Sequence, residues 1–257
     1  MVQPNPCSLV ILTKDSSLTL SACITSGLEI ASEVILVDNF SKDSTLDIAK
    51  KFEARIFQRD LESFGAQKQF AIDQAKNDWI FLLDSDEEIS PPLLNEIKKT
   101  LENPTINCAY KVPRKNFYLG SFLRFGGKYP DYQTRLFKKS LCHFSKDIVH
   151  EKVMANGVVG KLSKPIFHYS YPDIETWVRK LDLFARKNAE KWEQEGVRPS
   201  LLNFFTYCLL NPSSRFIRRY FLKGGFLDGL PGLLACIHDV LTEILSYSLI
   251  NQNKEKK

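Results

Sequence analysis

Apolar and polar positions alternate in two ways over the first hundred residues. Four short, largely apolar runs predict strands at residues 8–13, 33–38, 54–57 and 78–83. Between them, apolar residues recur every three or four positions and predict helices from about residue 17, after residues 41–45, over 66–76 and over 91–101. Strands that are apolar throughout are buried on both faces. The order therefore predicts an α/β fold with a mostly parallel sheet and helices on both faces.

The alternation weakens between residues 108 and 168. Short β-like pieces at 109–112, 134–137 and 166–169 are joined by glycine-bearing loops, which suits an acceptor-binding region. From Asp173 onward the spacing of apolar residues is helical, and Gly196 is predicted to end the helix that starts there. Two more helices are predicted to fill the rest of the chain.

Composition is that of a globular protein with a proper core: of 257 residues, 44% are apolar and 25% charged, which excludes fibrous and disordered classes. The net charge is +5, of which residues 197–257 supply +4. Six scattered cysteines without a CxxC or Cys/His pair argue against a zinc site or disulfide framework and favour a reducing compartment.

Targeting signals are not expected. The N-terminus has no basic region followed by an apolar stretch, so we predict no signal peptide. The apolar window 201–210 is too short to span a bilayer, and the window 226–250 is interrupted by charged residues. Neither window is predicted to be a transmembrane helix.

Candidate chemistry lies after the predicted strands, because ligands of parallel α/β sheets bind at the carboxyl ends of the strands. Three segments qualify: 13–15, 38–43 and 84–86. The chain contains no GxGxxG after a strand and no GxxxxGK[ST], which disfavours dehydrogenases and P-loop proteins.

Asp84 and Asp86 follow a buried strand. If the extended conformation continues, their carboxylates point the same way and share a Mg²⁺ or Mn²⁺ ion on a nucleotide diphosphate. The alternative is a solvated acidic turn ahead of a helix. Similarly, Asp38 either binds a base or ribose or caps the next helix, and Lys68 either meets a phosphate or lies on a solvated helix face.

Taken in order, segments 9–13, 34–38 with 41–45, 65–68 and 81–88 resemble family 2 glycosyltransferases of the GT-A fold. Segments 129–137, 149–151 and 168–171 resemble the lipopolysaccharide-core subgroup, whose better-known members are glucosyltransferases. The resemblance covers about residues 8–235. It implies a GT-A, Rossmann-like catalytic domain over 1–170, with a nucleotide-sugar half (1–107) and an acceptor half (108–170). A helical, amphipathic, membrane-proximal extension is implied over 171–257.

The resemblance also assigns roles at the donor site. The family commonly has Asn-Glu after the first strand, where this chain has Lys14 and Asp15, so Asp15 is expected to replace the glutamate. The residues expected to bind the nucleotide sugar are Thr13, Asp15, Asp38, Ser41, Lys68, Asp84, Ser85 and Arg135. Those expected to hold Mg²⁺ or Mn²⁺ are Asp84, Asp86 and His150.

Inverting transfer needs one carboxylate to take a proton from the acceptor hydroxyl. Similar enzymes carry this base where Asp131 stands; Glu151 is the rival, and a capping role is the plain alternative for Asp131. Arg135 suits a diphosphate or acceptor anion, although an arginine on an edge strand is usually only solvated. His168, like His150, either approaches the metal or is structural.

Basic and aromatic residues mix in the C-terminal part: Arg215, Arg218, Arg219 and Lys223 lie near Phe204, Phe205, Phe216, Tyr220 and Phe221. This mixture suits an anionic bilayer surface, and a helical lid packed on the sheet is the alternative. Nucleic-acid binding is not expected, because the basic residues form no long stripe.

The resemblance, taken with these residues, implies a metal-dependent, inverting hexosyltransferase. It would move a hexose, with glucose favoured, from a UDP-sugar to a lipopolysaccharide-core or other lipid-linked glycan. It would work in the cytoplasm, peripherally on the inner face of the cytoplasmic membrane. Two alternatives remain open: transfer to polyprenyl phosphate, and a catalytically silent protein that binds nucleotide sugars.

Overall fold

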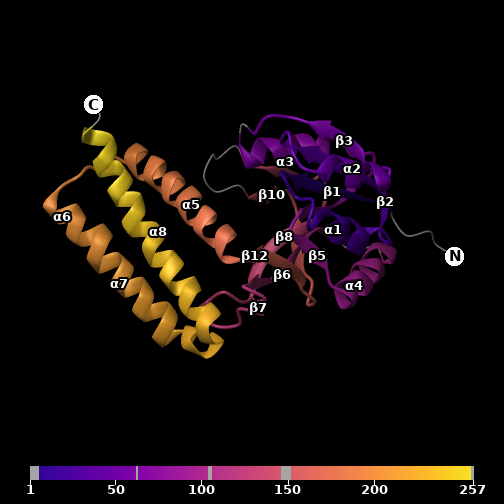
Figure 1. Cartoon of the computed structure of the whole chain (residues 1–257). Helices are drawn as coiled ribbons and strands as arrows, with labels where there is room; N and C mark the ends of the chain where they lie inside the picture. The colour runs from indigo at the N-terminus through magenta and orange to yellow at the C-terminus, as the bar shows by residue number, and fades with distance from the viewer. Residues whose placement is uncertain (1–5, 62, 104–105, 146–151, 256–257) are drawn as a thin grey trace. The chain divides into compact units, whose positions relative to one another are not determined.

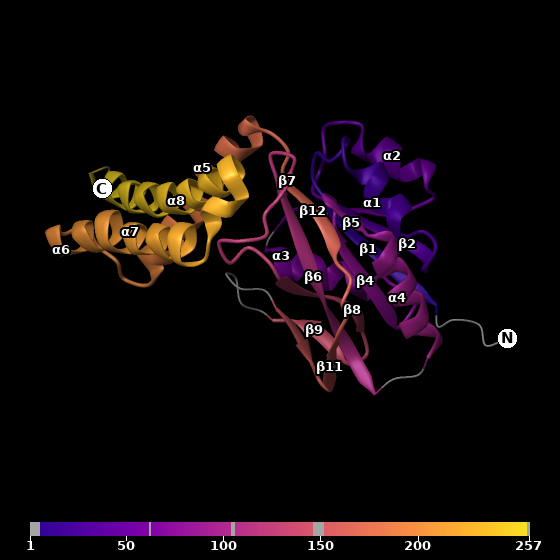
Figure 2. The same cartoon turned by 90° about the horizontal axis from the view of Figure 1, so that it is seen from below.

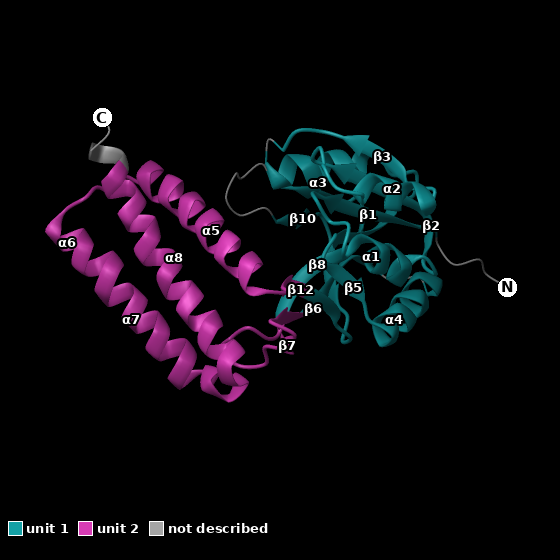
Figure 3. Ribbon diagram, in the orientation of Figure 1, with its two compact units in different colours: residues 1–114, 131–168 teal, residues 115–130, 169–257 magenta. Residues whose placement is uncertain are grey.

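The computed structural model describes residues 6–61, 63–103, 106–145 and 152–255. The chain forms two compact units (Figure 3). Unit 1 comprises residues 1–114 and 131–168, and unit 2 comprises residues 115–130 and 169–257. The second division, at residue 168, falls close to the expected end of the catalytic domain at residue 170. Unit 2 also includes 115–130, a segment of the expected acceptor half.

The first half of the sheet is parallel. Its strands are β1 (Cys7–Thr13), β2 (Ala31–Asp38), β3 (Arg55–Gln58) and β4 (Trp79–Asp84), in the order β3-β2-β1-β4. Each predicted apolar run thus forms a strand, and the α/β class is confirmed. Thr13 pairs with Asp38 and Leu12 with Asp84, so the carboxyl ends of three strands meet at one edge.

The second half of the sheet is antiparallel, which makes the sheet mixed. Beyond β4 follow β8 (Asp131–Lys138), β6 (Asn107–Tyr118), β12 (Ile166–Tyr171) and β5 (Glu87–Ile89). β8 runs antiparallel to both β4 and β6. No helix separates β6 from β8 in the described chain, and parallel neighbours would need such a crossover.

Four short strands lie outside this path. β7 (Ser121–Phe122) and β11 (Val158–Lys161) pair with β6, while β9 (Cys142–Phe144) and β10 (Val153–Ala155) pair with each other. The irregular region predicted between residues 108 and 168 therefore contains more strand than its weak alternation indicated.

Alternate residues of the strands feed two cores, because successive side chains point to opposite faces of a sheet. Leu9 and Leu36 pack with helices α1 (Leu20–Gly27), α2 (Thr45–Lys51) and α4 (Pro91–Glu102). Val10 and Ile35 pack with α3 (Phe64–Asp73). Figures 1 and 2 show α3 on one face and α1 and α4 on the other, as predicted.

Helix ends follow local side-chain chemistry. The Ser90 hydroxyl accepts a hydrogen bond from the Leu93 N–H at 3.4 Å and caps α4. Gly196 adopts φ +84° just after α5 (Ile174–Gln194), as predicted. Gly27 is the last residue of α1, and a Cβ there would lie 2.9 Å from Leu9 Cδ2. Close packing, not a left-handed turn, therefore requires this glycine.

Unit 2 is mostly helical. After α5, residues 201–222 form one continuous helical stretch of α6 (Leu201–Phe204), η1 (π-helical, Phe205–Leu210), α7 (Asn211–Phe216) and η2 (π-helical, Ile217–Leu222). Pro212 has no N–H, so the Cys208 carbonyl has no α-helical donor there. A short 3₁₀ turn, η3 (Gly225–Asp228), leads into α8 (Gly229–Glu255), which lies between α5 and α7 (Figure 1).

The helix over Gly225–Gln252 is long and apolar enough to cross a membrane by length and composition alone, with mean hydropathy 1.5. Within the 18-residue window that has this hydropathy, 44% of the residues are buried in the structure, and core helices pass the same test. Its acidic residues are paired within unit 2: Asp239 accepts from Lys128 Nζ at 3.1 Å and from Arg219, and Glu243 from Arg215. That α8 does not span a membrane stays a prediction.

Candidate active site

A tight turn follows β4 at the carboxyl edge of the sheet. Asp84 is the last residue of β4, residues 85 and 86 form the turn, and β5 starts at Glu87. The Asp84 N–H donates to Glu87 Oε2 at 3.1 Å and closes this turn. The chain is thus not extended through Asp86, contrary to the premise that aligned the two aspartates. Their side chains are 32% and 30% exposed.

Glu87 lies at the centre of a buried ion-pair network. Its side chain is fully buried, and its Oε1 accepts from Arg135 Nη2 at 2.6 Å and from Arg114 Nη1 at 3.2 Å. Arg135 Nη2 also donates to Asp84 Oδ2 at 2.6 Å. Arg135 stands on β8, an interior strand, so the edge-strand alternative is wrong. In this structure Arg135 orients two carboxylates.

The charges of this network decide the ionisation of Asp84. Burial raises the pKa of Asp84, but the nearby charges of Arg135 and Lys68 outweigh it and hold that pKa well below its usual range. Burial lowers the pKa of Arg135, whereas Asp84 and Glu87 raise it, and the net shift is upward. Asp84 is therefore a carboxylate at neutral pH.

Asp131 joins the same network through Arg114. Arg114 donates to Asp131 Oδ2 from Nε at 2.9 Å and from Nη2 at 2.7 Å, and Gln133 Nε2 donates to Oδ1 at 2.7 Å. Arg114 and Asp131 are direct cross-strand partners on β6 and β8. The Asp131 side chain is 30% exposed, so its fixed carboxylate is still reachable.

Sequence reasoning singled out neither Arg114 nor Glu87 as a site residue. The local signals were weak: Arg114 is a charge two residues after the β-like piece 109–112, and Glu87 is one of four acidic residues over 84–88. Their roles follow from strand pairing between distant segments.

The ends of β1 and β2 form a second part of the edge. The hydroxyl of Thr13, a residue 5% exposed, has no hydrogen-bond partner within the described ranges. Asp38 is fully buried; its carboxylate accepts from the Ser41 hydroxyl, from the Ser41 N–H at 2.8 Å and from Gln58 Nε2 at 3.2 Å. The oxygens of Asp38 thus organise the loop after β2.

Further contacts connect this loop to the turn after β4. The Asp15 N–H donates to Ser41 Oγ at 2.8 Å, and Asp15 Oδ1 accepts from the Lys42 N–H at 2.7 Å. The hydroxyls of Ser16 and Ser85 lie 2.7 Å apart. The three predicted segments therefore lie together at one edge of the sheet.

The donor atoms of this edge suit a hard divalent cation. In the described part of the chain no group of three or more His, Cys, Asp or Glu residues is arranged to hold a metal. Mg²⁺ needs fewer protein ligands, because it is held by one or two carboxylates together with waters and substrate phosphates. Asp84 and Asp86 supply two carboxylates on this turn, and His168 Nε2 lies 3.4 Å from Asp86 Oδ1. His150 and Glu151 lie outside the described residues.

Comparisons with known proteins identify the family of this chain. The family model "Glycosyl transferase family 2" matches residues 8–152. An uncharacterized glycosyltransferase of Rickettsia prowazekii is 32% identical over 239 residues, covering 87% of this chain and 81% of the relative. The lipopolysaccharide core biosynthesis glycosyltransferase LpsC of Rhizobium meliloti is 23% identical, covering 100% and 96%.

Among solved structures, glucosyl-3-phosphoglycerate synthase from Mycobacterium tuberculosis aligns with a TM-score of 0.36 and 20% identity over 44% of each chain. The match of the family model to more than half of the chain, and the relative above 30% identity, settle the family. This chain belongs to glycosyl transferase family 2.

Proposed function

We propose that this protein is an inverting hexosyltransferase that uses a UDP-sugar, with glucose as the favoured sugar, and Mg²⁺ or Mn²⁺. The acceptor would be a lipopolysaccharide-core or other lipid-linked glycan at the inner face of the cytoplasmic membrane. The observation that carries the proposal is the ion-pair network between Asp84 and Asp131. This network connects Asp84, which would bind the metal, to Asp131, which would be the base, through Arg135, Glu87 and Arg114. The likeness to LpsC along the whole chain supports the acceptor class.

The donor would bind along the ends of β1, β2 and β4. The unpartnered Thr13 hydroxyl is a ready hydrogen-bonding group for the uridine, since buried polar atoms normally have partners. Asp15, Asp38 and Ser41 would shape the loop around the nucleotide, and Ser85 would line the turn beneath it. Lys68 would add positive charge near the diphosphate.

A divalent cation held by Asp84 and Asp86 would offset the charge that builds on the leaving diphosphate. Arg135 keeps Asp84 ionised and fixes its orientation through the 2.6 Å contact. The site therefore has a preorganised carboxylate before any ligand arrives. Such preorganisation favours the transition state because little reorientation remains to be done.

Asp131 would accept the proton from the attacking hydroxyl. Arg114 and Gln133 hold both of its oxygens in defined positions. A fixed carboxylate suits a base that must take its proton from an acceptor hydroxyl bound in one orientation. Transfer of the proton to Asp131 would leave the acceptor oxygen free to attack the anomeric carbon as the bond to UDP breaks.

The test is UDP release from a panel of UDP-sugars, with lipid extract as acceptor and with or without chelator. We expect transfer that the chelator abolishes. Asp131→Asn should lower kcat by at least about a hundredfold, the usual contribution of a general base, with UDP affinity unchanged. Asp73→Asn, on the exposed end of α3, is the matched control. Full activity in Asp131→Asn would move the base elsewhere, and chelator-resistant transfer would remove the metal.

A further inference from the structure

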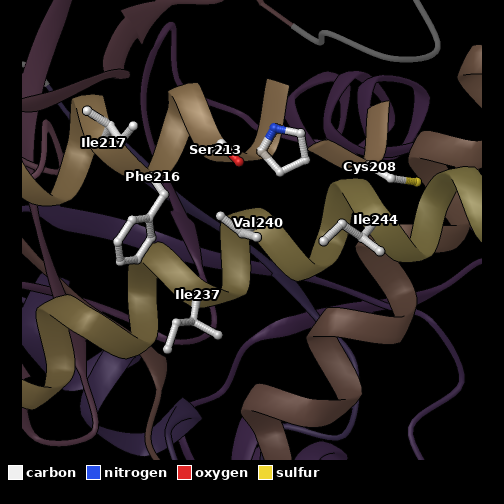
Figure 4. Close-up of a pocket in the computed structure, with 8 residues that line it drawn as sticks. Cys208, Ser213, Phe216, Ile217, Ile237, Val240 and Ile244 are labelled. Carbon is white, nitrogen blue, oxygen red and sulfur yellow. The ribbon is translucent and has the colours of Figure 1, made fainter. Parts of the chain in front are cut away.

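An apolar groove runs between α7 and α8 in unit 2. Its volume is about 440 Å³, within the range of small-molecule sites. Phe216 and Ile217 line it from one helical stretch, and Ile237, Val240 and Ile244 line it from α8 (Figure 4). None of its eight lining residues is charged, and Ser213 supplies a hydroxyl.

The groove opens onto an exposed apolar stripe. Phe205, Leu209, Ile217 and Phe221 recur at multiples of four residues along the helical stretch, and each is between 45% and 56% exposed. Ser213 lies four residues after Leu209 and four before Ile217, so it completes this series, and it also lines the groove. Exposed apolar side chains in such a continuous row mark a surface that contacts something apolar.

The other flank of the same stretch is cationic. A smaller polar groove there is lined by Ser214, Arg215 and Arg218 from the helical stretch and by Glu243 from α8. Arg215 pairs with Glu243, and Arg218 is exposed. Apolar residues on one flank and cations on the other are the arrangement of a helix lying in a membrane interface, where cations meet anionic headgroups.

We propose that the groove between α7 and α8 binds one hydrocarbon chain of an anionic membrane lipid. The uncharged lining excludes a polar ligand, and the apolar stripe would bring the groove to the hydrocarbon layer. The cationic flank selects an anionic leaflet. This inference rests on the peripheral membrane attachment in the proposed function, but it does not depend on the transfer reaction.

The test uses a fluorescent polyene fatty acid below its micelle concentration, without vesicles. The wild-type chain should bind it saturably. Decyl phosphate should displace it and inorganic phosphate should not. Ser213→Trp, which fills the groove, should weaken binding at least about tenfold, as expected when a ligand loses its apolar pocket. Ser248→Trp, on an exposed position of α8 outside the groove, should bind as the wild type does.

A second measurement works on the unaltered chain. A fatty acid with a diazirine at its chain end should label peptides spanning 208–217 and 237–244. Labelling confined to other peptides, normal binding by Ser213→Trp, or no saturable binding would each overturn the proposal. UDP release from the UDP-sugar in the presence of a soluble acceptor reports on the transferase separately. Loss of lipid binding in the groove and loss of transferase activity therefore give different results.

Discussion

Replacing Glu87 by glutamine tests whether the buried network holds unit 1 together. The wild-type carboxylate accepts three hydrogen bonds, from Arg135, Arg114 and the Asp84 N–H. Glutamine keeps the shape but removes the charge and turns one acceptor into a donor. The NH2 group of the glutamine then faces either the Asp84 N–H or a guanidinium. In both cases two hydrogen-bond donors face each other, and no hydrogen bond forms.

The size of the effect follows from the burial of Glu87. Breaking a buried ion pair costs about 3 to 5 kcal/mol, because a charge is left uncompensated. Asp84 and Asp131 still pair with the two arginines in the variant, so we expect the lower end, about 3 kcal/mol. At about 2 to 4 °C per kcal/mol for a unit of this size, the melting temperature should fall by about 6 to 12 °C.

Urea unfolding followed by circular dichroism measures the loss, and hydrogen exchange of peptides from β4 and β8 assigns it to unit 1. Glu88→Gln is the matched control. Glu88 is the next residue on β5 and is only half-buried, and burial raises its pKa, so its charge is not stabilised where it stands. It should change stability by less than about 0.5 kcal/mol. A Glu87→Gln chain as stable as the wild type would refute the argument.

Three further outcomes are expected. Burial lowers the pKa of His238 to about 4, below its unfolded value, so the unfolded chain binds the proton first. Stability should therefore fall as pH drops from about 6.5 to 4, by as much as about 3 kcal/mol, and His238→Phe should flatten this part of the pH–stability curve. Asp86→Asn should weaken Mn²⁺ binding in the presence of UDP, measured by electron paramagnetic resonance, by about tenfold or more. Ser90→Ala should cost about 1 kcal/mol of unfolding free energy in urea, and Ser90→Asp should restore it.

Each of these has a result that contradicts it. An unchanged pH profile in His238→Phe would show that groups other than His238 carry the acid sensitivity of this pH range. Equal Mn²⁺ affinity in Asp86→Asn and wild type would leave Asp84 as the ligand. A Ser90→Ala chain of unchanged stability would mean that the 3.4 Å cap contact contributes nothing.

Local chemistry was enough to predict the parallel half of the fold. Apolar runs marked β1, β2 and β4 because most of their side chains are buried, and Gly196 marked a helix end because capping depends on nearby atoms. The antiparallel half was harder to predict. β5 is a three-residue strand rich in acid, and no periodicity distinguishes it from a turn.

The candidate site was predictable only as far as it depends on strand ends. Asp84 and Thr13 stand where parallel strands end, so position alone pointed to them. Arg114 and Glu87 meet only because β5, β6 and β8 come together from separate segments, and no pattern within one segment encodes that meeting. Asp38 likewise accepts a hydrogen bond from Gln58, twenty residues away, which no local pattern predicts.

The π-helical stretches η1 and η2 determine how the helical stretch 201–222 tolerates length changes. Each π turn holds an extra residue that an α-helix would not accommodate. Deleting one residue inside η1 would convert that π turn into an ordinary α-helical turn. The residues after it would then keep their orientation. The same deletion inside α7 would rotate everything downstream by about 100° and move Ile217 off the groove. Homologous chains one residue shorter should therefore have lost that residue within 205–210 or 217–222.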